Sequence, residues 1–361
     1  MKKIVTILGA RPQFVKAAVL SRIIAKNSEF EEVTIHTGQH YDANMSDIFF
    51  TEMDIPIPKY NLNIKGLSHG VMTGKMIEKI EEVLMHEKPD AIIIYGDTNS
   101  TIAGALAAKK LDIKVFHVEA GLRSFNMKMP EEINRILTDR ISDLLFCPTD
   151  TAINNLKIEG FENFDAEVIK SGDIMKDAVE YYSTFSEEKS KIISSLKLED
   201  RSFILATIHR QENTDDLDKL KAIFEGLELI SKEAKVVIPL HPRTRKILKE
   251  NSLKYNVEII DPVGYFDMLE LLKHCLLVIT DSGGLQKEAF FNNKPCIIAR
   301  EETEWTELVE NGFATLVGSN KQKMLEAFQN YKNTSLDYTI NLYGNQVGMT
   351  IYEGIKNRIL D

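Results

Sequence analysis

Short apolar runs rich in β-branched residues alternate with longer amphipathic segments along almost the whole chain. Runs of about 4–8 apolar residues bounded by Gly, Pro, Asp or Thr are typical of buried parallel strands. The segments between them, such as 72–87 and 217–232, have helical periodicity. This alternation predicts an α/β fold with a doubly wound parallel sheet. The predicted strands are 4–8, 33–37, 91–95, 115–118, 144–147, 168–170, 203–207, 236–239, 257–260, 276–280, 296–299 and 315–317.

The predicted strands form two series, one before residue 172 and one after residue 202, and the polar stretch 183–200 lies between them. A chain of 361 residues is long enough for two domains. A single open sheet holding both series would be unusually wide. We therefore predict two Rossmann-like domains, residues 1–172 and 173–345, that face each other across a cleft.

Composition narrows the partners and the compartment. The formal charge of −10 argues against broad binding to nucleic acid or to an anionic membrane. No apolar run approaches the ~20 residues needed to span a bilayer, and no signal peptide opens the sequence. Cys147, Cys275 and Cys296 are odd in number and lie in apolar runs, which is typical of buried, reduced thiols. We expect a cytoplasmic protein.

Polar residues follow the predicted strands at their carboxyl ends, where ligands of such sheets bind. Six turns of this kind at one sheet edge predict a polar site between the domains. They are Gly9-Ala10-Arg11-Pro12, Gly96-Asp97-Thr98, Glu119-Ala120-Gly121, His209-Arg210, His241-Pro242-Arg243 and Asp281-Ser282-Gly283-Gly284.

The turn at 280–284 ends a strand and opens a helix predicted over 285–291. Gly283 and Gly284 let backbone N–H groups approach an anion, and the helix N-terminus adds positive potential. Ser282 can add its hydroxyl, so we predict a phosphate site; the alternative is a tight turn in which Asp281 or Ser282 caps the helix. Glu288 is either a ligand of ribose hydroxyls or a solvated carboxylate.

The first turn is not GxGxxG, so a bound dinucleotide of the Rossmann type is not expected. Arg11 and Lys16 lie five residues apart across this strand-to-helix turn. They are predicted to meet a diphosphate, the alternative being two surface cations.

Carboxylates that gather in a partly dry cleft repel one another, so one of them keeps a proton near neutral pH and serves as an acid or base. Asp97 and Glu119 follow apolar strands directly, and Glu131 and Glu132 follow Pro130 at a predicted helix start. Stabilisation of the helix dipole explains one of the latter pair. Their positions make Asp97, Glu119 and Glu131 candidate catalytic carboxylates.

His209 is predicted to act as an acid or base or to bind phosphate, the alternative being a structural, hydrogen-bonded histidine. His117 and His241 occupy similar positions, but the sequence supports a functional role for them less strongly. The His and Cys spacings match no metal motif, so no metal and no cofactor is expected.

At these turns the sequence resembles the non-hydrolysing UDP-N-acetylglucosamine 2-epimerases over nearly its whole length. The resemblance rests on several short motifs in a specific order. They are the turns given above together with Gly38-Gln39-His40, Tyr95-Gly96-Asp97-Thr98, His117-Val118-Glu119-Ala120-Gly121-Leu122-Arg123, Pro130-Glu131-Glu132-Ile133-Asn134-Arg135 and Tyr343-Gly344.

The resemblance implies a GT-B-like fold in which a last helix, 346–361, packs back on the first domain. It implies UDP binding mainly by the C-terminal domain, and epimerisation by anti elimination and re-addition of UDP. Asp97, Glu119, Glu131 and His209 match the family's catalytic positions. Its substrate-binding positions are matched by Arg11, Lys16, Arg135, Ser282 and Glu288, and we add Arg210, His241, Gly283, Gly284 and Trp305 as substrate ligands.

The sequence departs from the usual family pattern at two places. Thr303-Glu304-Trp305-Thr306 replaces the usual Thr-Glu-Arg-Pro, and 41–46 lacks the second glutamine of a substrate-activation site. These features resemble the branch acting on UDP-2,3-diacetamido-2,3-dideoxy-glucuronate. Trp305 would offer an apolar wall to an acetamido methyl group, or it is a packing residue. Arg123 or Lys128 would meet the additional carboxylate.

Three other functions stay open at this point. A GT-B glycosyltransferase shares the fold but needs an acceptor, and a hydrolysing epimerase would release free sugar. A non-enzymatic nucleotide-sugar sensor would not need several acid/base groups. The partners we expect are a UDP-sugar and a second copy of the chain.

Overall fold

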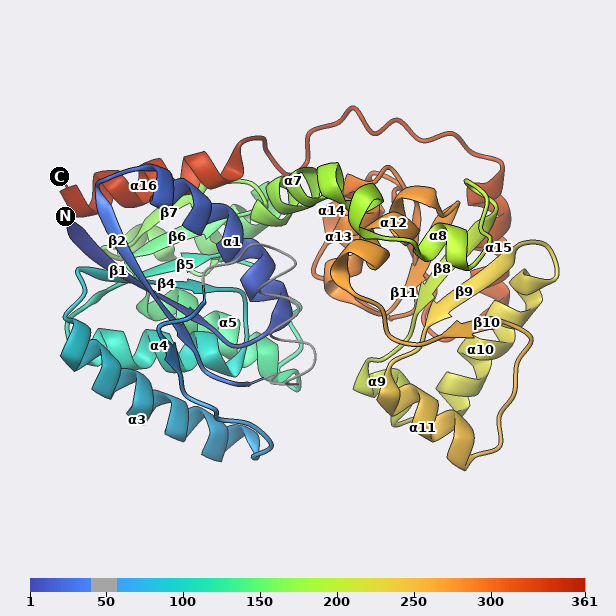
Figure 1. Cartoon of the computed structure of the whole chain (residues 1–361), viewed down its shortest axis with the longest axis horizontal. Coiled ribbons are helices and arrows are strands. Elements are labelled where there is room, and N and C mark those ends of the chain that lie inside the picture. Colours follow the sequence, from blue (N-terminus) through green and yellow to red (C-terminus); the bar gives the residue numbers. More distant parts are fainter. Residues whose placement is uncertain (40–56, 361) are drawn as a thin grey trace. The chain divides into compact units, whose positions relative to one another are not determined.

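The computed structural model describes residues 1–39 and 57–360. The chain divides into two compact units (Figure 1). Unit 1 comprises Met1–Ala178 and Asn341–Asp361, and unit 2 comprises Val179–Ile340. In the described part of the chain, no helix is both long and apolar enough to cross a membrane.

The sheet of unit 1 is parallel throughout, with the strand order β3-β2-β1-β4-β5-β6-β7. Its strands are β1 (Lys2–Leu8), β2 (Phe30–His36), β3 (Tyr60–Asn61), β4 (Ala91–Tyr95), β5 (Lys114–Val118), β6 (Leu144–Cys147) and β7 (Glu167–Lys170). The predicted strands of this half are present. The edge strand β3 was missed, because two residues form no apolar run.

Helices cover both faces of this sheet. α1 (Arg11–Lys26) and α16 (Val347–Leu360) lie on one face, and α3 (His69–Glu87), α4 (Asn99–Lys110) and α5 (Pro130–Ile141) lie on the other (Figure 1). Branched residues of β1 and β4, such as Ile7 and Ile94, pack with Met76 and Ile80 of α3 in a fully buried core. The remaining elements of unit 1 are α6 (Asp150–Ile158), the 3-10 turn η1 (Phe161–Asn163) and α7 (Ile174–Lys189), which runs on into unit 2.

The sheet of unit 2 is also parallel, with the order β10-β9-β8-β11-β12-β13. Its strands are β8 (Phe203–Thr207), β9 (Lys235–Pro239), β10 (Glu258–Ile260), β11 (Leu277–Thr280), β12 (Cys296–Ile298) and β13 (Ala314–Leu316). Its helices are α8 (Ile192–Ser195), α9 (Gln211–Thr214), α10 (Leu217–Ser231), α11 (Pro242–Glu250), α12 (Tyr265–His274), α13 (Gly283–Phe291), α14 (Thr306–Glu310) and α15 (Lys321–Lys332).

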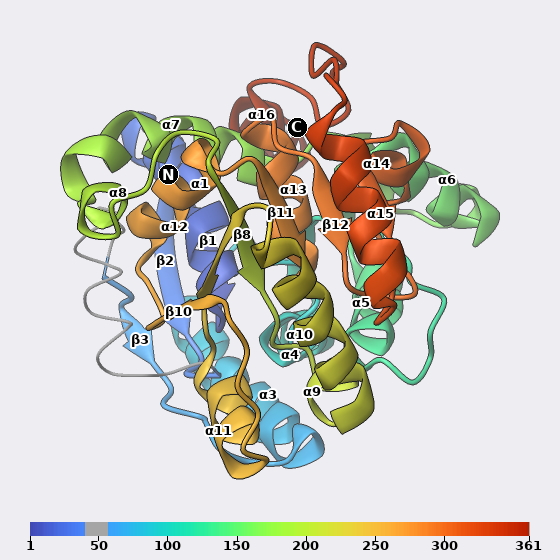
Figure 2. The same ribbon diagram turned by 90° about the vertical axis from the view of Figure 1, so that its right-hand side faces the viewer.

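Helices α10 and α15 lie side by side on the sheet of unit 2 (Figure 2). Phe224 of α10 and Phe328 of α15 are fully buried and pack with strand residues such as Ile204 and Ile279. Each such side chain contributes about 1.5–3 kcal/mol by leaving water. The predicted α/β class with two doubly wound parallel sheets is confirmed.

The chain leaves unit 1 and returns to it at adjacent points. The amide of Asp173 donates to the carbonyl of Tyr343 over 2.9 Å, and Lys176 Nζ donates to the carbonyl of Gly344 over 2.7 Å. Gly172 has a φ of +87°, and a Cβ there would collide with the Tyr343 carbonyl. The two connections therefore touch where they enter unit 1, and α16 then packs against α1.

Candidate active site

In unit 1 the strand order reverses between β1 and β4, which are hydrogen-bonded neighbours. Ligands of open parallel sheets bind at such a switch point, beyond the carboxyl ends of the strands. Buried Gln13 joins the two turns there, because its Oε1 accepts from the amides of Gly9 and Ala10 and its Nε2 donates to the carbonyl of Tyr95. Gln13 thus holds the turn after β1 and the turn that carries Asp97 in fixed positions relative to each other.

Asp97 has a fixed cation beside it. Arg135 of α5 donates to Asp97 Oδ2 from Nε over 3.0 Å and from Nη2 over 2.7 Å. Its Nη1 donates to Glu132 Oε2, and Glu132 also accepts from the amides of Ser124 and Phe125. Through these hydrogen bonds the fully buried Glu132 links the loop at Ser124 and Phe125 to α5. Its neighbour Glu131 is half-buried.

Glu119 forms an ion pair with Lys16 of α1, and both side chains are nearly buried. The backbone of Glu119 has a φ of +74°, which is uncommon for a residue with a side chain and is typical of functional turns. A Cβ on Gly96 would lie 3.3 Å from Glu119 Oε2, so glycine lets this carboxylate approach the Asp97 turn. The carboxylates of Asp97 and Glu119 therefore belong to one site, and each is paired with a cation.

Arg123 does not face this site. Its guanidinium is buried and donates to Asp139 Oδ2 and to both carboxylate oxygens of Glu159. The prediction that Arg123 is available to a substrate carboxylate is wrong, because two protein carboxylates already hold it. Lys128, the alternative, is exposed.

In unit 2 the strand order reverses between β8 and β11. The turn after β8 carries His209 and Arg210, and the turn after β11 carries Asp281. The Asp281 carboxylate is fully buried and accepts from the amides of His209 and Arg210 and from the side chain of Asn213. Asp281 does not cap α13; it holds the two turns of this switch point together.

His209 and His241 lie side by side at this switch point of unit 2, with ring centroids 5.9 Å apart. Burial lowers the pKa of His209, and the charge of Asp281, whose Oδ1 lies 3.5 Å from Nδ1, opposes the shift. Burial and the neighbouring His209 lower the pKa of His241. An imidazole that is neutral at pH 7 can accept a proton and, once protonated, return it.

The N-terminus of α13 is shaped for an anion. Ser282 is the N-cap residue, and a Cβ on Gly283 would collide with the carboxylate of Glu304. Arg210 Nη2 lies 3.7 Å from the same point. A carboxylate already occupies the position where the helix N-terminus and a guanidinium favour negative charge.

Trp305 is 3% exposed, and Lys287 Nζ lies 3.9 Å above the centre of its ring. Lys287 belongs to α13 and is itself 1% exposed, so this contact is a buried cation–π pair. The packing alternative for Trp305 agrees with this burial.

The structure thus groups the predicted site residues at two switch points. Lys16, Asp97, Glu119 and Arg135 meet in unit 1, and half-buried Arg11 begins α1 beside them. In unit 2, His209, Arg210, His241, Ser282, Gly283 and Gly284 lie at the strand ends, and Glu288 Oε1 is 3.9 Å from a Cβ built on Gly284. The motif residue His40 and the segment 41–46 lie outside the described residues.

Sequence reasoning missed Asp139, Asn213 and Glu304. One signal was available for Asp139, since it follows Arg135 by four residues and so shares its face of α5. Among the described residues, no three His, Cys, Asp or Glu side chains are grouped to hold a metal ion.

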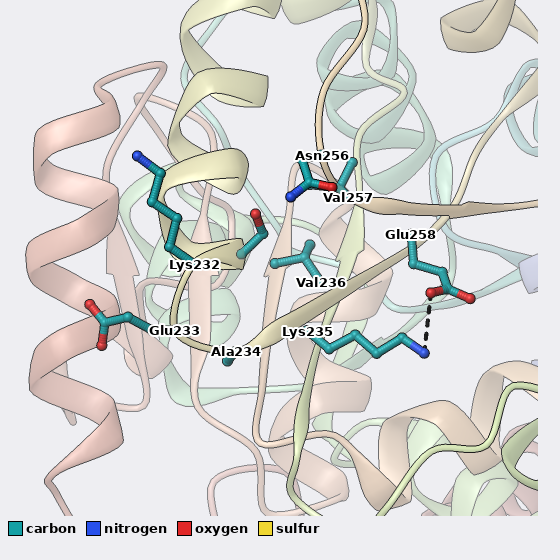
Figure 3. A pocket seen from close by; sticks show the side chains of 9 residues that line it. Lys232, Glu233, Ala234, Lys235, Val236, Asn256, Val257 and Glu258 are labelled. Atoms are coloured by element: carbon teal, nitrogen blue, oxygen red, sulfur yellow. Dashed lines mark ion pairs between the residues drawn. The ribbon is translucent and has the colours of Figure 1, made fainter.

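A separate hollow of about 450 Å³ lies on unit 2. Lys235 and Glu258, paired over 3.1 Å, line it together with Asn256 (Figure 3). These residues stand at the amino ends of β9 and β10, at the sheet edge opposite the site. The hollow therefore has no part in the switch-point chemistry.

Comparison with known proteins gives one family. The family model described as UDP-N-acetylglucosamine 2-epimerase matches residues 22–350. A UDP-2,3-diacetamido-2,3-dideoxy-D-glucuronate 2-epimerase of Pseudomonas aeruginosa is 52% identical over 95% of this chain and 96% of its own.

Two solved structures have the same fold. The UDP-GlcNAc 2-epimerase of Methanocaldococcus jannaschii, in complex with UDP-GlcNAc and UDP, aligns with a TM-score of 0.90 at 42% identity over 99% of this chain and 100% of that one. The UDP-GlcNAc 2-epimerase of Neisseria meningitidis, bound to UDP-GlcNAc, aligns with a TM-score of 0.87 at 32% identity over 99% and 100%.

Proposed function

The chain belongs to the UDP-N-acetylglucosamine 2-epimerase family and is an epimerase with a GT-B-like fold, and we propose that it inverts C2 of a UDP-linked 2-acetamido sugar without hydrolysing it. The observation that carries this proposal is the pair of switch-point half-sites. One presents carboxylates held beside cations, and the other presents a helix N-terminus, a guanidinium and neutral imidazoles.

The reaction we propose needs a base, an acid and a bound diphosphate. A base removes the proton from C2, the C–H electrons form a C1–C2 double bond, and UDP leaves C1 with its bonding pair. UDP then adds back at C1, and a proton is delivered to C2 from the opposite face. Asp97, Glu119, Glu131 and His209 are the proposed acids and bases, since such groups typically contribute about 10²–10⁴-fold each.

We assign UDP binding to the C-terminal domain, proposed as residues 173–345. Ser282, Gly283 and Gly284 at α13 would receive the diphosphate, with Arg210 and His241 beside it and Glu288 toward the ribose. The N-terminus of α13 and the nearby Arg210 guanidinium support this assignment, because both favour negative charge at Gly283. Arg11, Lys16 and Arg135, from the domain proposed as 1–172 with 346–361, would complete the site.

The substrate we propose is UDP-2,3-diacetamido-2,3-dideoxy-glucuronate, with UDP-N-acetylglucosamine as the alternative. Similarity to the Pseudomonas enzyme supports the first sugar. Trp305 supports this sugar only indirectly. Its ring is buried, so it does not present an apolar surface to an acetamido methyl group, but it can shape the site through Lys287. Lys128 is the cation we propose for the extra carboxylate.

We also propose a cytoplasmic homodimer. All three cysteines are free and buried, which suits a reducing compartment. On α5 the apolar residues Ile133 and Leu137 are 41% and 49% exposed, although the polar face of the same helix is buried. An outward apolar strip of this kind is typical of a subunit contact.

Reaction in deuterated water tests the proposal. The enzyme is incubated with each UDP-sugar alone, and the mixture is followed by NMR. We expect C2 inversion with deuterium at C2 of the recovered UDP-sugar. Inverted product without deuterium would exclude proton removal, and free sugar with UDP would indicate a hydrolysing enzyme. No change without an added acceptor would favour a glycosyltransferase.

A further inference from the structure

His117 of β5 lies beneath the two turns that carry Asp97 and Glu119, and its side chain is fully buried. Its Nδ1 is 2.7 Å from Asp139 Oδ1, and its Nε2 is 2.8 Å from the carbonyl oxygen of Gly96. The ring is therefore bound at both nitrogens by oxygen atoms.

Both of these oxygens are acceptors. A backbone carbonyl can only accept, and a carboxylate in its ionised form can only accept. Asp139 is held in that form, because its Oδ2 accepts from Arg123 Nη1 over 2.7 Å and from the amide of Gly121 over 3.1 Å.

We infer that His117 is an imidazolium ion, protonated at both ring nitrogens, and that it is the positioning residue for the turn that carries Asp97. The inference rests on the proposed epimerase site. His117 touches Gly96 and not the reacting groups, so it acts through the backbone.

The charges around the ring balance. His117 and Arg123 are positive, and Asp139 of α5 and Glu159 at the end of α6 are negative. Cys147 of β6 is a further titratable group near Asp139, and burial keeps its pKa well above the ordinary value, so it is uncharged. A buried ion pair is tolerated when further hydrogen bonds satisfy both partners, as they do here.

This cluster fixes the geometry of both turns. Gly96, with a φ of +61°, donates its amide to the carbonyl of Val118 over 3.0 Å and accepts from His117. The two peptide groups that flank Gly96 are thus both held by β5. Asp139 holds the amide of Gly121 on the other turn, so one carboxylate links the backbones next to Asp97 and Glu119. Hydrogen bonds from a charged donor are roughly twice as strong as neutral ones, which suits a positioning role.

Asp139→Asn separates the charge of this cluster from its shape. The amide oxygen of the new side chain can accept from Arg123 and Gly121, and its NH₂ can donate to His117 Nδ1. A neutral ring would still donate from Nε2 to Gly96. Every hydrogen bond has a replacement, and the positive charge on His117 is lost.

The first measurement is NMR of the full chain with ¹⁵N-labelled histidine at neutral pH, with His117→Gln to assign the signal. We expect two protonated ring nitrogens for His117 in the wild type and one in Asp139→Asn. A wild-type ring with a single protonated nitrogen would overturn the imidazolium assignment. This spectrum needs no substrate, so its outcome is independent of the proposed function.

The second measurement is kinetic. Asp139→Asn and His117→Gln should lower kcat by roughly 10- to 100-fold, since a small misplacement of a reacting group costs this much. KM and UDP affinity should change by less than about 2-fold, because neither residue touches the ligand. Asp143→Asn is the matched control: Asp143 binds Lys109 and the amide of Val115 at the opposite end of the same strand.

Normal kcat in both variants would exclude the positioning role, and an equal loss in Asp143→Asn would reduce it to general stability. If the wild type turned over neither UDP-sugar, the proposed function would fail. Hydrogen exchange at 96–98 would then test the positioning, and it should be faster in both variants than in the wild type.

Discussion

His36, His209 and His241 share one property, a pKa that burial lowers below the ordinary value of 6.5. For His36 the hydrogen bond to Asn61 opposes the shift, and for His209 the charge of Asp281 opposes it. Between the folded-state and unfolded-state pKa values the unfolded chain binds more protons, so the free energy of unfolding rises with pH. These residues make the fold less stable as the pH falls below about 6.5.

We therefore predict that His209→Gln weakens the pH dependence of stability in unit 2. Urea unfolding is measured at pH values about one unit above and one unit below 6.5. Fluorescence of Trp305, the single Trp of the chain, reports on unit 2. Wild type should lose more stability on acidification than the variant. His86→Gln, at an exposed position on α3, should behave as wild type, and equal acid sensitivity in all three proteins would contradict the prediction.

At the scale of elements, substitution of Gly121 and of Gly74 by alanine should change the free energy of unfolding in opposite directions. Gly121 has a φ of +79°, and a Cβ there would lie 2.6 Å from the carbonyl oxygen of Ala152. Gly74 lies within α3, and beyond its own helical turn no atom of the described residues lies within 4 Å of an added Cβ.

Gly121→Ala should lower the free energy of unfolding by at least about 2 kcal/mol, because the left-handed conformation alone costs about 1–2 kcal/mol. Gly74→Ala should raise it by about 0.5–1 kcal/mol, since glycine is a poor helix former. Thermal unfolding followed by circular dichroism measures both. An unchanged free energy of unfolding in Gly121→Ala would contradict the prediction and would mean that the turn carrying Glu119 can adjust its backbone without cost.

Most helices and strands could be predicted from the sequence, but the buried face of α5 could not. Buried parallel strands such as β4 need apolar side chains on both faces, so their runs are visible in the sequence. On α5 the rule is reversed: Glu132, Arg135 and Asp139 are buried, and Ile133 and Leu137 are exposed. An apolar periodicity therefore points to the wrong face of this helix.

The site was predictable to the extent that its residues follow strands directly. Asp97, Glu119 and His209 do so, and the rule that ligands bind at strand carboxyl ends selected them as candidates. Asp139 and Glu304 reach the site from a helix interior and from a loop after β12. Their roles depend on partners far away in sequence, such as His117 and Gly283, and no local pattern predicts such pairs.

At the scale of the whole molecule, binding and chemistry should separate between the units. We predict that Asp97→Asn lowers turnover by ~10²-fold or more, the usual scale for an acid/base group. It should keep the thermal stabilisation by UDP, which amounts to about 2.7 kcal/mol when UDP is at 100 times its Kd. Arg210→Ala should lose most of that stabilisation.

The measurement is the UDP-induced shift in Tm, read by Trp305 fluorescence, beside turnover of the UDP-sugar. Each protein without UDP gives the baseline for its own shift. If Asp97→Asn abolished the UDP shift, or Arg210→Ala kept it in full, the proposed division of roles would be wrong.

The adjacent connections at Gly172 and Gly344 bear on how the chain is made. All of unit 2 lies between the two segments of unit 1, and α16, which packs on α1, follows unit 2 in the sequence. Domains generally fold as units during synthesis, N-terminal first. Unit 2 is fully synthesised once Ile340 has been added. At that point α16 has not yet been made, so the face of α1 that it covers is still exposed. Unit 2 can therefore fold before unit 1 is complete, and removal of α16 would destabilise the unit that contains Met1–Ala178.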